Sequence, residues 1–328
     1  MTICTNLNIF GSTDKKNVYI CVTMQNEPKE KRGRIAAVGT FDGVHLGHKS
    51  VLNLLKSQGL QRQLEPVAFT FRRHPLCLIN PANEPPELTP LWKKKKLLDE
   101  AGVSPIVLDF DEALRATSAL QWMERLVNEF GVKVLVVGYD HTFGSDGINM
   151  SVEDYRNLGR SIGLEVILGD EIEGVSSSAI RKAVKDGDMP AARKMLGRPF
   201  SITSKVTEGN KLGHSLGFPT ANIMPPAGGA LPKPGVYAAI VKTLSDGRKF
   251  PAMVNIGTRP TVMRGNDTVL EAHLIGFSGD LYGKEITVRF LKRLRDEKKF
   301  DSIEALKNQL AADKIETEDL IKSESGLK

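Results

Sequence analysis

The stretch RIAAVGTFDGVHLGH, residues 34–48, joins an apolar run to a glycine-rich turn that ends in two histidines. The apolar run predicts a buried strand that ends near Phe41, and a helix is expected to begin around His45 or Gly47. His45 and His48 are three residues apart, so they lie on one face of the first helical turn. Backbone N–H groups at a helix start bind phosphate, and glycines let a ligand approach closely. The stretch therefore predicts a phosphate site with two imidazoles beside it.

The segments that follow this turn predict an α/β domain. Short apolar runs suit strands that are buried on both faces of a parallel sheet, and segments with helical spacing lie between them. The further runs are PVAFTF (66–71), SPIVLDF (104–110), VKVLVVG (132–138) and LEVILGD (164–170). Three helical segments end on a glycine: Gly102, Gly131 and Gly163. This alternation predicts a doubly wound sheet, with the ligand at the carboxyl ends of the strands.

The pattern changes near residue 200. The later segments are short strands separated by glycine, proline or Ser-Asp-Gly turns, which predicts an antiparallel sheet or small barrel. A helical segment, residues 302–322, closes the chain. Residues 185–200 are the expected join, so we predict two domains, 1–187 and 188–328.

Composition limits the possible partners. The net charge is +6, and the whole excess lies in residues 188–328, where 22 Lys and Arg face 16 Asp and Glu. Aromatic residues make up only 6%, so a nucleic-acid platform is not expected. No apolar run is long enough to span a bilayer, and no secretory signal pattern opens the sequence. Three cysteines at unrelated spacings read as reduced thiols, which predicts a cytoplasmic protein. The sequence does not indicate an oligomeric state.

Simpler interpretations stand beside the functional ones. A lone histidine in a turn is most often structural, and two histidines at i and i+3 without acidic or cysteine neighbours make a poor zinc site. The lysines of WKKKK, residues 92–96, spread around more than one helix face, so we expect solvated surface and no phosphate site.

A second candidate site lies in LGHSLGFPTANI, residues 212–223. Thr220 and Asn222 project oxygens on one side of an extended segment, and such oxygens suit Mg²⁺ carrying a nucleotide. An isolated PTAN sequence is more often a turn. Further along, Glu271 and His273 alternate on one face of a predicted strand.

The ten residues GTFDGVHLGH resemble the HxGH signature of nucleotidyltransferases, in the form found in the adenylyltransferase half of bacterial bifunctional riboflavin kinase/FAD synthetases. VGYDHTFG (137–144) and VSSSAIRKAV (175–184) resemble two further segments of that family. The resemblance implies that His45 and His48 stabilise phosphoryl charge and that Arg181 grips the leaving pyrophosphate. It also implies that a set of residues contacts the nucleotide or flavin: Gly39, Phe41, Asp42, Asp140, Ser177 and Ser178.

Two departures from this pattern are visible. Ser178 stands where the family usually has threonine, and the hydroxyl is kept. FTFRRHP (69–75) has Arg73 in place of the first proline of a family segment, and we assign no chemical role to His74.

The second half resembles riboflavin kinases, whose segments occur here in the family's order. The resemblance implies that Glu271 is the general base and that Thr220 and Asn222 hold Mg²⁺, whereas His273 is structural. It also places three residues among those that bind nucleotide or flavin: Gly209, Gly213 and Arg295. His214 replaces a common arginine, which weakens phosphate binding near neutral pH, and Gly276 replaces a common aspartate.

The resemblance covers residues 34–313 and implies a bifunctional transferase. Riboflavin is phosphorylated by ATP to FMN, and FMN is then adenylylated by a second ATP to FAD with release of pyrophosphate. Two alternatives stay open at this stage. One is an enzyme in which a single site works; the other is a flavin-binding or RNA-binding regulator built on the same folds.

Overall fold

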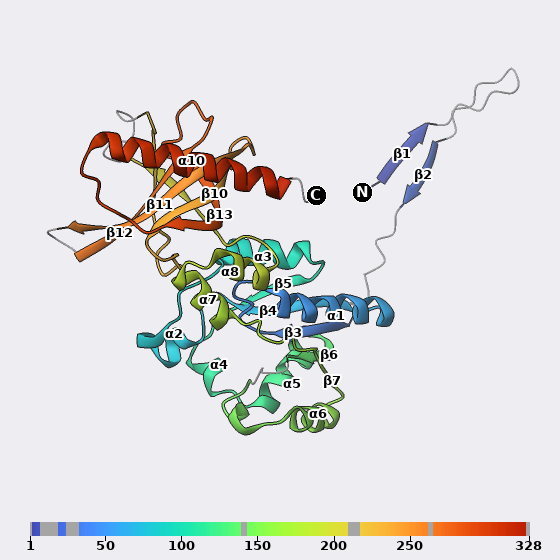
Figure 1. The fold of residues 1–328 in the computed structure, drawn as a ribbon. Helices are drawn as coiled ribbons and strands as arrows, with labels where there is room; N and C mark the ends of the chain where they lie inside the picture. Colours follow the sequence, from blue (N-terminus) through green and yellow to red (C-terminus); the bar gives the residue numbers. More distant parts are fainter. Residues whose placement is uncertain are drawn as a thin grey trace, which may run out of the picture.

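The computed structural model describes residues 2–6, 19–23, 33–138, 143–208, 217–261 and 265–325. Figure 1 shows an α/β unit, a barrel covered by one long helix, and a short antiparallel pair near the N-terminus. That pair consists of β1 (Thr2–Asn6) and β2 (Tyr19–Thr23). Both predicted fold classes are confirmed by the sheets described below.

The α/β unit contains a five-stranded parallel sheet in the order β5-β4-β3-β6-β7. Its strands are β3 (Arg34–Val38), β4 (Glu65–Phe71), β5 (Ser104–Leu108), β6 (Val132–Val137) and β7 (Glu165–Leu168). The strand order reverses beside β3, because the chain builds outward to β5 and then returns to β6. Open parallel sheets bind their ligands at the carboxyl ends of the strands at such a switch point. The HLGH turn follows β3 at this point.

Helices cover both faces of this sheet, as a doubly wound fold requires. Leu52, Leu55 and Leu98 of α1 and α3 pack on one face, and Trp122 and Met123 of α5 pack on the other. The helices are α1 (Leu46–Arg62), α2 (Leu76–Ile79), α3 (Leu91–Glu100), α4 (Glu112–Ala116), α5 (Ala119–Phe130), α6 (Val152–Ser161), α7 (Ser177–Asp186) and α8 (Met189–Leu196). Two single 3₁₀ turns are η1 (Pro81–Asn83) and η2 (Gly147–Asn149).

The helix boundaries have local chemical causes. Ser118 and Ser151 each form a capping box at the start of α5 and α6. Gly131 ends α5 with φ 66°, in the left-handed region that glycine adopts without a steric penalty. Gly102 and Gly163 also have left-handed φ, of 80° and 72°. The predicted glycine stops are therefore confirmed.

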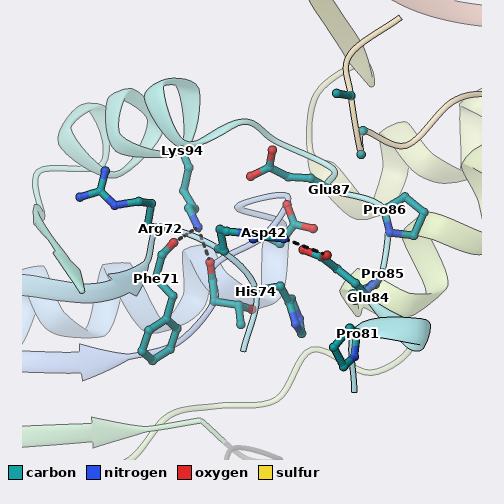
Figure 2. Close-up of a pocket in the computed structure, with 15 residues that line it drawn as sticks. Asp42, Phe71, Arg72, His74, Pro81, Glu84, Pro85, Pro86, Glu87 and Lys94 are labelled. Atoms are coloured by element: carbon teal, nitrogen blue, oxygen red, sulfur yellow. Dashed lines mark hydrogen bonds and ion pairs between the residues drawn. The ribbon is translucent and has the colours of Figure 1, made fainter. Parts of the chain in front are cut away.

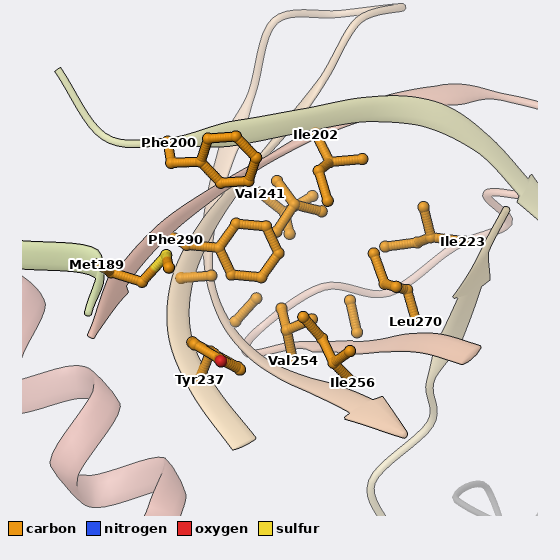
Figure 3. Close-up of a cluster of buried hydrophobic side chains, with 14 of the residues drawn as sticks. Met189, Phe200, Ile202, Ile223, Tyr237, Val241, Val254, Ile256, Leu270 and Phe290 are labelled. Atoms are coloured by element: carbon orange, nitrogen blue, oxygen red, sulfur yellow. The ribbon is translucent and has the colours of Figure 1, made fainter. Parts of the chain in front are cut away.

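The second half of the chain forms a closed antiparallel barrel in the order β10-β11-β12-β9-β8-β13. The strands are β8 (Ser201–Thr207), β9 (Ala221–Ile223), β10 (Gly235–Thr243), β11 (Lys249–Thr261), β12 (Gly265–Leu274) and β13 (Glu285–Arg295). Aromatic and branched side chains such as Tyr237, Phe290 and Val254 fill its interior (Figure 3). The terminal helix α10 (Ile303–Ser325) packs against β10 and β11.

The barrel core continues into the α/β half. Leu88 and Ile180 of the α/β half belong to the same buried cluster as the barrel interior, together with Met189 and Leu196 of the connecting helix α8. Glu87 also joins the halves, because its N–H donates to Gly228 O and its carbonyl accepts from Ala230 N, both at 2.8 Å. The two halves therefore share apolar packing and backbone hydrogen bonds.

Two of the four consecutive lysines on α3 are not solvated, so that prediction is wrong for them. Lys94 is only 5% exposed, and Lys93 lies at the contact with the barrel, where its Nζ donates to Ser201 Oγ at 2.5 Å. Lys95 and Lys96 are exposed as expected. The residues that face inward are thus set by how α3 docks.

Burial, together with the positive charges of Arg198 and Arg289, lowers the pKa of Lys93 from 10.5 to about 8. The folded state therefore releases the Lys93 proton at lower pH than the unfolded state, so stability rises as pH increases from about 8 to 10.5. We predict that Lys93→Met removes most of this rise in the midpoint of urea unfolding, whereas Lys95→Met leaves it intact. An equal rise in both variants would contradict the assignment.

Candidate active sites

The turn between β3 and α1 has an unusual backbone. Phe41, Gly43 and Val44 have φ of 46°, 85° and 39°, all in the left-handed region. Phe41 and Val44 are buried, at 3% and 1% exposure, and a bulky or branched residue in this region costs of order 1–3 kcal/mol. Such a conformation persists only where the surroundings hold it, and strain of this kind gathers at functional sites.

Asp42 lies within this turn, and its buried carboxylate holds the turn in place. Its oxygens accept hydrogen bonds from the backbone N–H groups of Leu88 and Thr89, each at 3.0 Å. Arg181 of α7 donates to Asp42 Oδ2 at 2.5 Å, and Ser177 Oγ donates to the Asp42 carbonyl at 2.9 Å. The carboxylate of Asp42 is thus used by the protein itself, and its contact with a cofactor stays a prediction.

Arg181 has two partners within the chain, because its Nε also donates to Pro86 O at 2.8 Å. A second cation, Arg198, approaches the turn from the segment that leads into the barrel. Its guanidinium donates to Val44 O at 3.0 Å and to Gly43 O at 2.5 Å. Burial lowers the pKa of Arg198 to about 10, so it stays charged at neutral pH.

The two histidines begin α1 as a stacked pair. His45 is the N-cap residue, and its Nδ1 accepts from His48 N at 3.3 Å. The two rings lie 3.6 Å apart at an interplanar angle of 18°, and Phe41 packs 5.2 Å from the His48 ring. Since Nδ1 of His45 accepts, its ring proton is on Nε2, which makes Nε2 a donor.

A cavity of about 550 Å³ opens beside both histidines. Gly39 and Gly138 at the ends of β3 and β6 form part of its wall, and the first turns of α1 and α7 face it. Two helix N-termini and two glycines that follow strands form a surface suited to a polyphosphate. The predicted residues gathered on its wall are Gly39, Phe41, His45, His48, Ser177 and Ser178.

A second cavity, of about 670 Å³, is apolar, and no sequence motif marked it. Aromatic side chains line it, including Phe71, Phe110 and Trp122, with Phe71 and Phe110 packed edge to face at 5.6 Å. It meets the first cavity at Val38 and Thr40, which line both. The sequence signal was the aromatic residue that ends each of two apolar runs.

A third cavity, of about 640 Å³, is polar and lies between the two halves of the chain (Figure 2). Asp42, His74, Glu87 and Lys94 line its α/β side, and residues 227–229 close it from the barrel side. His74 Nδ1 accepts from Leu76 N at 3.2 Å, which fixes the turn before α2. Burial and the nearby charge of Arg181 lower the His74 pKa, which keeps the ring neutral near pH 7.

The barrel gathers the second set of predicted residues. Asn222 of β9 lies directly opposite Glu271 of β12, which in turn lies opposite Asn255 of β11. Leu270 and Ala272 point into the buried core, so Glu271 and its cross-strand neighbours lie on the outer face. Thr220 is only two residues before Asn222. Carboxylate, amide and hydroxyl oxygens are the ligands that Mg²⁺ prefers, so the side chains here suit that ion.

His273 holds the segment that carries Thr220. Its Nδ1 lies 2.9 Å from the carbonyl oxygen of Pro219, and its ring packs on Phe218 with centroids 5.2 Å apart. Burial lowers the pKa of His273, so the ring is neutral and Nδ1–H donates to that carbonyl. The geometry agrees with the structural role predicted for this histidine.

Arg295 has a structural partner. Its guanidinium donates to both carboxylate oxygens of Asp313 on α10, at 2.7–3.1 Å, and it lies 5.8 Å from the Phe300 ring. This ties α10 to β13, and a contact with nucleotide or flavin stays a prediction. Asp140, Gly209 and Gly213 lie outside the described residues.

Comparison with known proteins assigns each half. The family model for FAD synthetase matches residues 27–180, and the model for riboflavin kinase matches residues 196–321. The chain belongs to the bifunctional riboflavin kinase/FMN adenylyltransferase family. A member from Pseudomonas fluorescens is 36% identical and aligns over 88% of this chain and 94% of its own. A member from Bacillus subtilis is 33% identical, over 92% and 96% of the two chains.

A solved structure has a similar arrangement of elements over most of this chain. It is described as a macrolide-efflux protein from Streptococcus pneumoniae, has a TM-score of 0.80 and 29% identity, and covers 88% of this chain and 94% of its own. In the described part of the present chain, no helix is both long and apolar enough to cross a membrane.

We predict that Asp42→Asn lowers FAD formation by at least tenfold, because the neutral amide breaks the buried pair with Arg181 and presents N–H groups where the carboxylate accepted them. The kinase reaction of the same variant should stay within about twofold. Both rates are measured on one preparation by separating riboflavin, FMN and FAD. Wild-type FAD formation would show that the turn does not need this charge.

Proposed function

We propose that this protein converts riboflavin to FMN in its barrel half and FMN to FAD in its α/β half. Both reactions are those of its family, and the two family models match separate halves of the chain. The observation that carries the assignment of the FAD site is the cavity beside the stacked histidines, with two helix N-termini on its wall. We place the domain boundary between Gly187 and Asp188, which separates α7 from α8.

In adenylyl transfer, an oxygen of the FMN phosphate attacks the α-phosphorus of ATP and pyrophosphate leaves. A phosphate monoester is already a competent nucleophile, so no covalent protein intermediate is required. Catalysis then consists of alignment and of stabilising the charge that develops on the phosphoryl oxygens. We assign that stabilisation to His45 and His48, with Ser177 and Ser178 as further donors. We assign binding of the leaving pyrophosphate to Arg181, whose guanidinium also donates a hydrogen bond to Asp42.

The two adjoining cavities divide the substrates by polarity. ATP phosphates belong in the glycine-lined cavity, and the flat apolar flavin ring belongs in the aromatic one beside Phe71, Phe110 and Trp122. Because the cavities meet at Val38 and Thr40, the two substrates are brought together at the end of β3.

In the barrel half, Glu271 removes the proton of the ribityl hydroxyl, whose oxygen attacks the γ-phosphorus of ATP while ADP leaves. Thr220 and Asn222 would hold Mg²⁺, which supplies positive charge to the nucleotide phosphates. His273 keeps Thr220 in position through the Pro219 carbonyl.

The sequence also supports a cellular location and a class of partners. The odd number of cysteines at unrelated spacings supports a cytoplasmic enzyme. The excess of basic residues in the barrel half serves nucleotide phosphates, and no nucleic-acid partner is proposed.

We expect His48→Ala to lower FAD formation by about 10²–10³, which is typical for losing one donor to a developing charge. Riboflavin phosphorylation should continue, because His48 lies on α1, away from the barrel strands. The test incubates each variant with ATP, Mg²⁺ and riboflavin and separates the three flavins. Simultaneous loss of both reactions would show that the reactions are assigned to the wrong halves.

Glu271→Gln should give the converse result. The amide keeps the size of the side chain but cannot accept the ribityl proton, so FMN formation should fall by about 10²–10⁴. FMN supplied from outside should still be converted to FAD at the wild-type rate. Wild-type phosphorylation in this variant would exclude Glu271 as the base.

A further inference from the structure

Lys94 of α3 is a buried charge that the proposed mechanism does not use. Only 5% of the residue is exposed. Its Nζ donates to Thr40 O, in the turn after β3, at 3.0 Å and to Phe71 O, at the end of β4, at 3.1 Å. Figure 2 shows Lys94 and Phe71. It forms no ion pair with any residue that the structure describes.

Burying an ammonium is costly, and two carbonyls do not compensate it fully. Burial lowers the pKa of Lys94, and only the more distant carboxylates of Asp42 and Glu87 act in the opposite direction. An ammonium has three N–H donors, and the described part of the chain supplies acceptors for two. The remaining donor and the uncompensated charge both favour an anion in the adjoining cavity.

The position of Lys94 identifies where that anion lies. Thr40 lines each of the three cavities described above, and Phe71 lines both the polar cavity and the aromatic one. The ammonium lines the polar cavity and is bonded to the carbonyls of two residues at the junction where that cavity meets the others. Given the proposed function, the flavin ring lies on one side of this junction and the ATP phosphates on the other. The phosphate of FMN lies between them.

The other cations of the polar cavity already have acidic partners. Arg72 pairs with Asp109 at 2.7 Å, and Arg73 pairs with Glu84 at 3.2 Å. His74 is neutral near pH 7, as argued above. Lys94 is thus the cation at this wall that lacks a carboxylate partner among the described residues.

We propose that Lys94 is a catalytic residue of adenylyl transfer, whose third N–H binds an oxygen of the FMN phosphate. The proposal rests on the proposed function. Lys94 keeps its proton throughout: an FMN oxygen forms the new bond to the α-phosphorus of ATP, and the bond to the pyrophosphate oxygen breaks. The ammonium holds the nucleophile at the junction and balances its charge against that of the triphosphate.

The first test compares Lys94→Met with Lys95→Met, a neighbour on the exposed face of the same helix. Loss of one charged hydrogen bond should lower kcat/KM for FMN in FAD formation by about 10- to 100-fold. KM for ATP and the rate of riboflavin phosphorylation should stay within about threefold of wild type. Lys95→Met should match wild type in all three. An unchanged kcat/KM for FMN, or equal losses for FMN and ATP, would overturn the proposal.

The second test follows the pH dependence of kcat/KM for FMN and uses Lys94→Arg. In the wild type, activity should decline in alkaline solution as Lys94 loses its proton, at a pH below the usual lysine range. A guanidinium stays charged there, so Lys94→Arg should retain its own activity to higher pH. The titratable groups that face Lys94 across the polar cavity are the carboxylates of Asp42, Glu84 and Glu87, the guanidinium groups of Arg72 and Arg73, and His74, whose pKa is lowered by burial so that its ring is neutral in alkaline solution.

Lys93 titrates nearby, with a pKa of about 8, so Lys93→Met serves as the control and should keep the alkaline decline. A decline that is unchanged in Lys94→Arg would overturn the proposal, even if Lys94→Met fails to fold. Failure of the proposed function itself is distinguishable, because wild-type protein would then make no FAD at any pH.

Discussion

The buried carboxylate of Asp42 is the interaction on which the α/β site depends. Three features meet there. They are a turn with strained left-handed backbone, two backbone N–H groups from Leu88 and Thr89, and the guanidinium of Arg181. A charged acceptor with several donors is the kind of interaction strong enough to hold strained backbone. With the turn held, His45 can cap α1, and the two imidazoles face the cavity at the carboxyl ends of β3 and β6.

The same interaction links the two halves of the protein. Leu88, whose N–H binds Asp42, has its side chain in the barrel core, and Arg198 reaches back from the barrel side to the carbonyls of Gly43 and Val44. The turn is therefore fixed from both domains at once. Displacement of the barrel would remove donors and packing from a backbone that has no intrinsic preference for its conformation. The α/β site is thus built by the whole chain.

Sequence patterns predicted the elements well and the long-range contacts poorly. The doubly wound sheet, the barrel and the HLGH turn each have a local signature, because periodicity and glycine position are properties of short segments. The partners of Asp42 at Leu88 and Thr89 lie 46 and 47 residues away, and no local pattern carries them. The sequence does not distinguish the buried lysine from its neighbours in the run 93–96, because all four residues are lysine. Only the docking of α3 determines that Lys94 is buried. The aromatic cavity likewise combines Phe71, Phe110 and Trp122 from three separate elements.

The two proposed sites differ in the charge of the groups they present, because their nucleophiles differ. An alcohol is a poor nucleophile until it loses its proton, and the barrel accordingly presents a carboxylate, Glu271, beside amide neighbours on the same face. A phosphate monoester is already anionic, so a base would add only repulsion. In the α/β half, imidazoles and the first turns of two helices face the phosphate cavity, and the carboxylate of Asp42 in the adjoining turn is paired with Arg181. The pairing of Asp42 with Arg181 both holds the turn and offsets the negative charge of a carboxylate beside two phosphates that must approach each other.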